Sequence, residues 1–146
     1  IALVELGQVN YALGNYRKAI EYYEQGLAIA RNIGSPQNES LILGNLGVPY
    51  FQLGEYSKAS NYYQQQLTLA RSIKDRNGES AALTNLGIFY NGLGDYGKAI
   101  DYYQQSLALA QQIKYRKGEM SALGNLGHLY NDIGDYSEAI KYLQQQ

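Results

Sequence analysis

The chain has 146 residues, 45% of them hydrophobic, with 12 Lys and Arg residues against 13 Asp and Glu residues, one His and no Cys. This length and apolar fraction suffice for one soluble domain with a core, and a net charge of -1 without a basic block argues against a nucleic-acid partner. The lack of cysteine and of a histidine cluster excludes disulfides, a thiolate nucleophile and most metal sites, and no run of about 18 apolar residues is available to span a membrane.

A Leu-Gly pair recurs at a constant interval along the chain. It occupies positions 6–7, 46–47, 86–87 and 126–127, so the interval is 40 residues. Gly14, Tyr16 and Ala19 have counterparts at the same interval in each later repeat. A constant interval is typical of a solenoid, in which each repeat buries its apolar face against its neighbours.

Each repeat is predicted to contain two helices. In the third repeat, apolar residues recur at every third or fourth position from 83 to 90 and again from 96 to 110, which is helical spacing. Between these segments, Gly94 is predicted to end the first helix and Asp95 to cap the second. The corresponding caps in the other repeats are Asn15, Glu55 and Asp135.

The first helices of the later repeats have start signals of their own. Ser35 precedes Pro36, and proline is suited to the first position of a helix. Asp75 is predicted to cap the next first helix, with Glu79 in its first turn. Tyr115 stands at the same place in the last repeat, where we expect a less sharply capped junction.

The glycine of each Leu-Gly pair lies in the middle of a predicted helix, where it costs roughly 1 kcal/mol relative to alanine. We expect it to face the repeated alanine of the second helix, such as Ala99, because two small residues let the backbones approach closely. Tyrosine rings such as Tyr103 would then fill the space above and below this contact.

Pro49 interrupts the pattern of the second repeat. Inside a helix, proline removes an N–H group and clashes with the preceding turn, at a cost of about 3 kcal/mol. We expect a bend at residues 45–49 that leaves the Asn45 carbonyl free for water or ligand.

These residues resemble the tetratricopeptide repeat, whose motif has a large apolar residue, Leu-Gly, Tyr, Gly-x-Tyr, Ala, an aromatic residue and a further Ala. The third repeat matches this motif at Leu83, Leu86, Gly87, Tyr90, Gly94, Tyr96, Ala99 and Tyr103, with Ser106 in place of the last Ala. Leu replaces the first Trp of the motif, and the interval of 40 exceeds the common one of about 34. The chain is therefore similar to the long-repeat subclass that includes the Leu-Gly-Asn spindle adaptors, kinesin light chains and bacterial multi-repeat proteins. The resemblance implies an all-α fold, a right-handed α-solenoid of stacked antiparallel helix pairs.

We expect residues 1–146 to form a single array with repeats at approximately 1–34, 35–74, 75–114 and 115–146, the first and last of them incomplete. The sequence opens inside a first helix and stops inside a second one, so we interpret it as a piece of a larger, cytoplasmic protein. Ile1, Leu3 and Leu6 at the start, and Ile140 and Leu143 at the finish, should lie on faces that a neighbouring repeat would cover. Because these two faces are complementary, we expect head-to-tail self-association.

Asparagine precedes three of the four Leu-Gly pairs, at Asn45, Asn85 and Asn125. Asparagine is a poor helix former and cannot act as a cap in the middle of a helix. One interpretation is a ladder of amides between adjacent first helices. The other is a row of donors and acceptors on the concave face, because in related tetratricopeptide domains the matching asparagine contacts a bound peptide. Glu5 takes this position in the first repeat, which is expected to bind differently or not at all.

The family pattern places further positions on the concave face. They are small, apolar or amide residues: Val4, Gly44, Thr84 and Gly124; Gln8, Val48, Ile88 and His128; Tyr11, Phe51, Asn91 and Asn131. The lysines and arginines with which chaperone-binding relatives clamp an acidic C-terminus do not occur at these positions. Arg76 and Arg116, at the start of two first helices, either reach the edge of the groove or are solvated charges at helix ends.

Catalytic chemistry has little support in the sequence. His128 is the only histidine of the chain, and it has no nucleophile or metal partner set. The tyrosine pairs such as Tyr102 and Tyr103 favour helix packing over base stacking, since no basic track accompanies them. We therefore expect a non-enzymatic module that binds a peptide segment of a partner protein, without cofactor, metal, nucleic acid or membrane. The alternative is a structural spacer or self-assembling repeat element whose groove stays empty.

Overall fold

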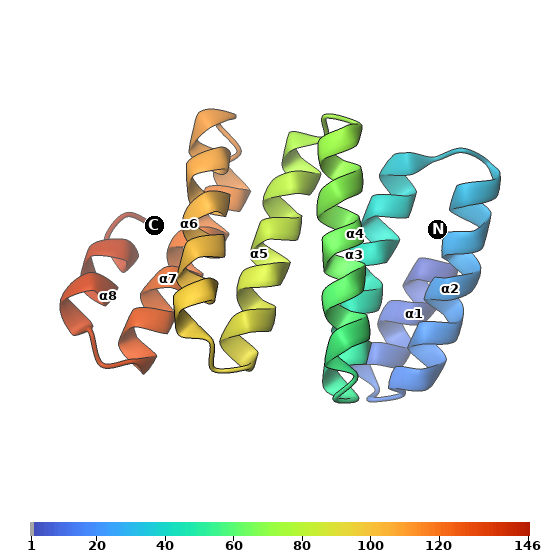
Figure 1. Cartoon of the computed structure of the whole chain (residues 1–146), viewed down its shortest axis with the longest axis horizontal. Helices are drawn as coiled ribbons and strands as arrows, with labels where there is room; N and C mark the ends of the chain where they lie inside the picture. Colours follow the sequence, from blue (N-terminus) through green and yellow to red (C-terminus); the bar gives the residue numbers. More distant parts are fainter. Residues whose placement is uncertain (1) are drawn as a thin grey trace. The chain divides into compact units, whose positions relative to one another are not determined.

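The computed structural model describes residues 2–146, which form α-helices joined by short turns and contain no strand (Figure 1). Ile1, named above as part of an exposed end face, lies outside the described residues. The helices are α1 (Ala2–Ala12), α2 (Tyr16–Asn32), α3 (Pro36–Gln52), α4 (Tyr56–Ser72), α5 (Arg76–Gly92), α6 (Tyr96–Gln112), α7 (Arg116–Asp132) and α8 (Tyr136–Leu143). The predicted all-α fold class, with two helices in each repeat, is confirmed.

The chain divides into two compact units, Ile1–Gly78 and Glu79–Gln146. In the first unit, α1 packs against α2, α2 against α3, and α3 against α4. In the second unit, α6 packs against α7 and α7 against α8. Consecutive helices within each unit run in opposite directions (Figure 1). Each unit therefore contains the antiparallel helix pairs that the periodicity predicts.

The turns inside the repeats end on glycine in a left-handed conformation, as predicted. Gly54 has a φ of 74° and Gly94 a φ of 77°, values that residues with a Cβ seldom adopt. The turns between repeats use the same backbone shape, but only the first of them has glycine, Gly34. At the other two turns the residue in the left-handed conformation is Lys74 or Lys114, with φ values of 57° and 56°. Because lysine has a Cβ, this conformation is strained at both positions.

The aspartates cap their helices as predicted. Asp75 Oδ1 accepts a hydrogen bond from the Gly78 N–H at 2.9 Å, and Asp95 and Asp135 accept equivalent bonds from the third residue of their helices. The predicted caps Asn15 and Glu55 were wrong, because neither side chain bonds its helix N-terminus. The Glu55 carboxylate instead pairs with the Arg17 guanidinium at 2.8 Å and with a lysine of its own helix. Tyr115 forms no side-chain cap, as expected.

At Gly7, Gly47 and Gly87 the nearest contact is a tyrosine ring of the second helix and not the predicted alanine, whereas at Gly127 it is Leu143, followed by the carbonyl oxygen of Ala139. A Cβ added to Gly87 would lie 2.5 Å from the nearest ring carbon of Tyr103, four residues after Ala99 on α6. Gly47 is covered in the same way by the ring of Tyr63. The close approach is therefore between a helix backbone and an aromatic face, and any larger residue would displace the ring.

Pro49 lies within α3, which continues through it to Gln52. The Leu53 N–H donates to the Pro49 carbonyl at 3.1 Å, so the hydrogen-bonded turn after the proline is intact. Proline has no N–H, so the Asn45 carbonyl lacks its usual donor four residues ahead. The expected bend at residues 45–49 stays a prediction.

Candidate functional site

The three predicted asparagines lie in the middle of α3, α5 and α7, each next to a fully buried leucine. Asn45, Asn85 and Asn125 are all half-buried, whereas Leu46 and Leu126 are 0% exposed. The leucine therefore anchors the helix in the core, and the asparagine lies at the boundary between core and solvent. A half-buried amide has part of its donor and acceptor capacity available to a ligand.

Asn45 has a donor without an acceptor. Its Nδ2 atom is buried, and no group in the described part of the chain accepts a hydrogen bond from it. Burying an amide donor without a partner costs about 1–3 kcal/mol, so Asn45 lowers the stability of the folded chain. The sequence indicated the asparagine, but it could not show that the amide donor of Asn45 lacks a hydrogen-bond partner, because that depends on how the neighbouring helices pack.

Thr84, predicted on the concave face, is bonded inside its own unit. Its Oγ1 atom lies 2.8 Å from Ser106 Oγ and donates to the Ser80 carbonyl at 3.1 Å. Ser80 and Ser106 are 1% and 0% exposed, so these hydroxyls form a buried polar cluster between α5 and α6. A peptide contact to the Thr84 hydroxyl would have to compete with these bonds.

The predicted groove positions Gly44 and Gly124 are each covered by a glutamine, Gln66 of α4 and Gln146, which follows the end of α8 at Leu143. A Cβ on Gly44 would lie 2.6 Å from the Gln66 amide nitrogen, and Gln66 is only 4% exposed. At Gly124 the corresponding atom is the Gln146 amide nitrogen, at 2.7 Å, which donates to the Met120 carbonyl. The sequence did not reveal this pairing. The signal for it was Ser106, which replaces the last Ala of the motif and occupies the same position of its repeat as Gln66 and Gln146.

The remaining predicted residues are spread along α5 and α7. Arg76 and Arg116 are exposed at the first residue of α5 and α7, and the Arg116 guanidinium lies 4.0 Å from a carboxylate of its own helix. His128 and Asn131 are exposed on α7. Asn91, on α5, is half-buried.

Asn91 is positioned by a buried tyrosine. Burial raises the pKa of Tyr103 to about 12, and a hydrogen bond with the Asn91 side chain partly opposes this rise. Tyr63, the counterpart of Tyr103 in α4, has its pKa raised by burial as well. These phenol groups are therefore neutral at physiological pH and can act only as hydrogen-bonding groups.

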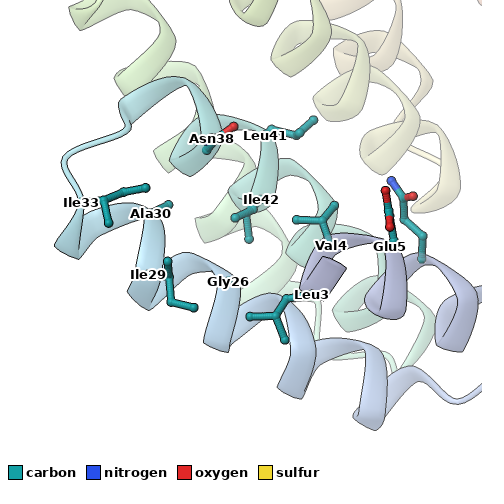
Figure 2. Close-up of a pocket in the computed structure, with 11 residues that line it drawn as sticks. Leu3, Val4, Glu5, Gly26, Ile29, Ala30, Ile33, Asn38, Leu41 and Ile42 are labelled. Atoms are coloured by element: carbon teal, nitrogen blue, oxygen red, sulfur yellow. The ribbon is translucent and has the colours of Figure 1, made fainter. Parts of the chain in front are cut away.

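A cavity of about 310 Å³ lies among α1, α2 and α3 (Figure 2). Most of its lining is aliphatic, with Ile42 of α3 and Ile29 of α2 on two sides. Four of its residues come from α1, and three of these, Val4, Glu5 and Gln8, occupy positions that the repeat pattern predicts on the concave face. The rest of the lining comes from positions outside the predicted groove.

A family model for the tetratricopeptide repeat matches residues 1–72 and 78–145. The chain belongs to the tetratricopeptide repeat family. Repeats of this family commonly mediate protein–protein interaction. No curated protein sequence matches the chain.

Solved structures share this tetratricopeptide fold at low sequence identity. A Rap protein complexed with competence and sporulation factor has a TM-score of 0.88 at 21% identity, covering 98% of this chain and 40% of its own. BtubC from P. vanneervenii has a TM-score of 0.81 at 23% identity, covering 98% and 59%. The kinesin light chain-like repeats of Podosopora anserina have a TM-score of 0.78 at 19% identity, covering 99% and 71%. The chain thus spans about half the length of the first two.

Within residues 2–146 of this tetratricopeptide chain, no three His, Cys, Asp or Glu side chains are grouped so that they could hold a metal ion. None of the helices in that stretch has the length and apolar character needed to cross a membrane. The polar groups at the candidate positions are amides, hydroxyls, the Glu5 carboxylate, the His128 imidazole and the exposed guanidinium groups of Arg76 and Arg116, all of which can form hydrogen bonds.

Proposed function

We propose that this tetratricopeptide array is a non-catalytic interaction module that binds an extended peptide segment of a partner protein along its first helices. The observation that carries the proposal is the asparagine at the same position of α3, α5 and α7, half-buried in each. A mid-helix asparagine is unfavourable for the helix itself, so its recurrence is explained by a ligand that pairs with the amides.

The spacing of helices suits an extended ligand. Neighbouring helices pack about 8–10 Å apart, and an extended chain advances about 3.3 Å per residue, so Asn85 and Asn125, which lie in the same unit, would meet peptide residues about three positions apart. The complex of a Rap protein with competence and sporulation factor, on the same fold, agrees with the use of such arrays for binding. Two asparagines would be sufficient to fix the register of a peptide.

The test is a triple substitution, Asn45→Ala, Asn85→Ala and Asn125→Ala, assayed against peptides selected from a random octapeptide library on the unmodified chain. Peptide affinity should fall more than tenfold, about 1.4 kcal/mol, with helicity and melting temperature nearly unchanged. The matched control replaces three exposed asparagines, Asn32, Asn61 and Asn77, by alanine. A large loss of thermal stability with peptide affinity unchanged would instead establish a structural amide ladder.

A second candidate function, self-assembly, rests on the exposure of the end helices. Leu6 of α1 is 43% exposed, whereas its counterparts Leu46 and Leu126 are 0% exposed. On α8, Ile140 is 55% exposed, whereas its counterpart Ile20 is 5% exposed. The second copy of the chain would bring its α8 face to α1 of the first, in the way that α2 packs against α3, and such head-to-tail contacts build open chains.

Light scattering over a wide concentration range tests this assembly. We expect concentration-dependent association that either Val9→Asp or Ile140→Asp abolishes, because each places a charge in the contact. Met120→Asp, at a side chain 43% exposed on α7, is the control and should leave association unchanged. A monomer at millimolar concentration would exclude self-assembly and leave the peptide-binding proposal intact.

A further inference from the structure

Helix α5 contains two Asn-Gly dipeptides, Asn77-Gly78 in its first turn and Asn91-Gly92 in its last turn. An asparagine followed by glycine is prone to deamidation, because glycine has no Cβ to shield its nitrogen from the asparagine side chain. Every other asparagine of the chain is followed by a residue with a side chain. The two dipeptides are chemically identical, so any difference in their reactivity in the folded chain comes from the structure around them.

The first dipeptide lies in a part of α5 that is weakly held. The Asn77 side chain is exposed and forms no hydrogen bond with any residue in the described range 2–146. Asparagine and glycine are both poor helix formers, and Lys74, just before the helix, is strained in the left-handed conformation. Buried side chains begin only at Glu79 and Ser80, which are 7% and 1% exposed. The first turn can therefore open while the rest of α5 stays folded.

One side-chain hydrogen bond holds the Gly78 nitrogen in its helical position. Asp75 Oδ1 accepts this bond from the Gly78 N–H at 2.9 Å. The carboxylate lies directly against the glycine, where an added Cβ would collide with it. While the bond is formed, the peptide plane between Asn77 and Gly78 cannot rotate its nitrogen toward Asn77 Cγ. The Asp75 cap therefore limits how often the nitrogen is available for reaction.

The second dipeptide is held on both sides. Asn91 is half-buried, and its side chain forms a hydrogen bond with Tyr103, which is 2% exposed. The Asn91 carbonyl accepts a hydrogen bond from the Gly94 N–H at 3.0 Å, so the backbone of this turn is fixed as well. Asn91-Gly92 is therefore an internal control, with the same chemistry in a closed environment.

We propose that Asn77 is a modification site at which the folded chain deamidates spontaneously in water, at a rate limited by the Asp75 cap. When the first turn opens, a solvent base removes the Gly78 amide proton and the nitrogen attacks Asn77 Cγ. The new N–Cγ bond closes a succinimide ring, the Cγ–Nδ2 bond breaks, and the side-chain nitrogen takes up a proton and leaves as ammonia. One water molecule then opens the ring at either carbonyl, which gives aspartate or isoaspartate. Water is the only co-reactant.

Either product changes the start of α5. The formal net charge of -1 gains one further negative charge, which the helix dipole favours at the second residue of a helix. Isoaspartate also lengthens the main chain by one methylene group, which displaces Gly78 from the Asp75 carboxylate. Because the reaction is irreversible, the charge of the chain changes with its age. This inference is independent of the proposed peptide binding.

The test is incubation of the folded 146-residue chain in water labelled with heavy oxygen, followed by peptide mapping with mass spectrometry. We expect Asn77 to be converted to aspartate and isoaspartate with uptake of one labelled oxygen, and Asn91 to react roughly tenfold more slowly or less. In denaturant both dipeptides should react at similar rates, which shows that the assay detects each of them. Equal rates at Asn77 and Asn91 in the folded chain, or conversion at neither, would overturn the proposal.

Two variants test the role of the cap. Asp75→Ala should speed the conversion of Asn77 about fivefold, since an N-cap side chain stabilises its helix by about 1 kcal/mol. Asp75→Ser keeps a capping oxygen and should react like the unmodified chain. Slower conversion in Asp75→Ala would mean that the carboxylate acts as a base, and it would refute the cap as a barrier. If Asp75→Ala unfolds, which faster reaction at Asn91 would reveal, Lys74→Gly takes its place and should slow the conversion by relieving the strained turn.

Discussion

Replacing Pro49 by valine tests how much the second repeat loses through a missing N–H. Pro49 is less than 2% exposed, and valine has a similar volume and occupies the same position in the first repeat, at Val9. Proline costs about 3 kcal/mol in a helix interior and valine about 0.6 kcal/mol, which gives a gain of about 2 kcal/mol for Pro49→Val. The more flexible unfolded chain of the variant offsets about 0.4–1 kcal/mol of this. We therefore expect a net stabilisation of about 1–2 kcal/mol.

Chemical denaturation followed by circular dichroism measures this free energy, and hydrogen exchange shows whether the new amide at position 49 is protected. Pro36→Val is the control, because Pro36 is at the start of α3, where a missing N–H costs nothing. Only Pro49→Val should stabilise the chain to this extent. The bulkier Pro49→Phe, which introduces the residue that the third repeat has at Phe89, should stabilise the chain less than Pro49→Val, because overpacking costs about 1–3 kcal/mol, as much as the gain itself. Destabilisation by Pro49→Val, or an unprotected amide, would show that the helix has adapted to proline and contradict the reasoning.

Three further predictions concern the backbone and the buried tyrosine. Lys74→Gly should stabilise the chain by about 1 kcal/mol because it relieves the left-handed strain at this turn, whereas Lys74→Ala, which keeps the Cβ, should not; thermal unfolding compares the two. Gly87→Ala should destabilise by about 1–3 kcal/mol, because its Cβ would collide with the Tyr103 ring, whereas Gly97→Ala in open space should stabilise by about 1 kcal/mol. The raised pKa of Tyr103, about 12, means that its contribution to stability is complete below pH 10 and is lost as the pH rises toward 12. Stability measured from pH 9 to 12 should therefore fall, and less steeply for Tyr103→Phe.

The helices could be predicted because their signals are local. The interval of 40 residues, the left-handed glycines and the aspartate caps are each encoded within a few positions, and the structure has them where the sequence indicates. The prediction that Glu55 caps its helix was wrong because its carboxylate pairs with Arg17, 38 positions earlier. A contact between residues so far apart in the sequence forms only in the folded chain. The partner of the mid-helix glycine was misassigned for a related reason. Helical periodicity says which residues share a face, but it does not say whether Ala99 or the larger Tyr103 fills the gap.

The candidate site, like the fold, could be predicted from the sequence only in part. The asparagines were indicated by their position in the repeat, and the structure places them at the edge of the core. The hydrogen bonds of the positions next to them depend on which side chain the following helix presents, and this differs from repeat to repeat. Thr84 illustrates this, because its hydroxyl is taken up by Ser106, one helix further along.

The pairs between a first helix and the following second helix show how one fold can carry a specific site. The Leu-Gly pair is the same in every repeat. Leu46, Leu86 and Leu126 are 0% exposed, and the glycines Gly47 and Gly87 lie against a tyrosine ring. The neighbouring pair varies: Gly44 is matched by Gln66, Thr84 by Ser106 and Gly124 by Gln146. In these repeats a polar side chain from the second half of the repeat fills the space beside the first helix, whereas in the first repeat Val4 lies beside Gly26. Variation at this pair leaves the core contacts intact, so it can change what a repeat offers a ligand without changing the fold.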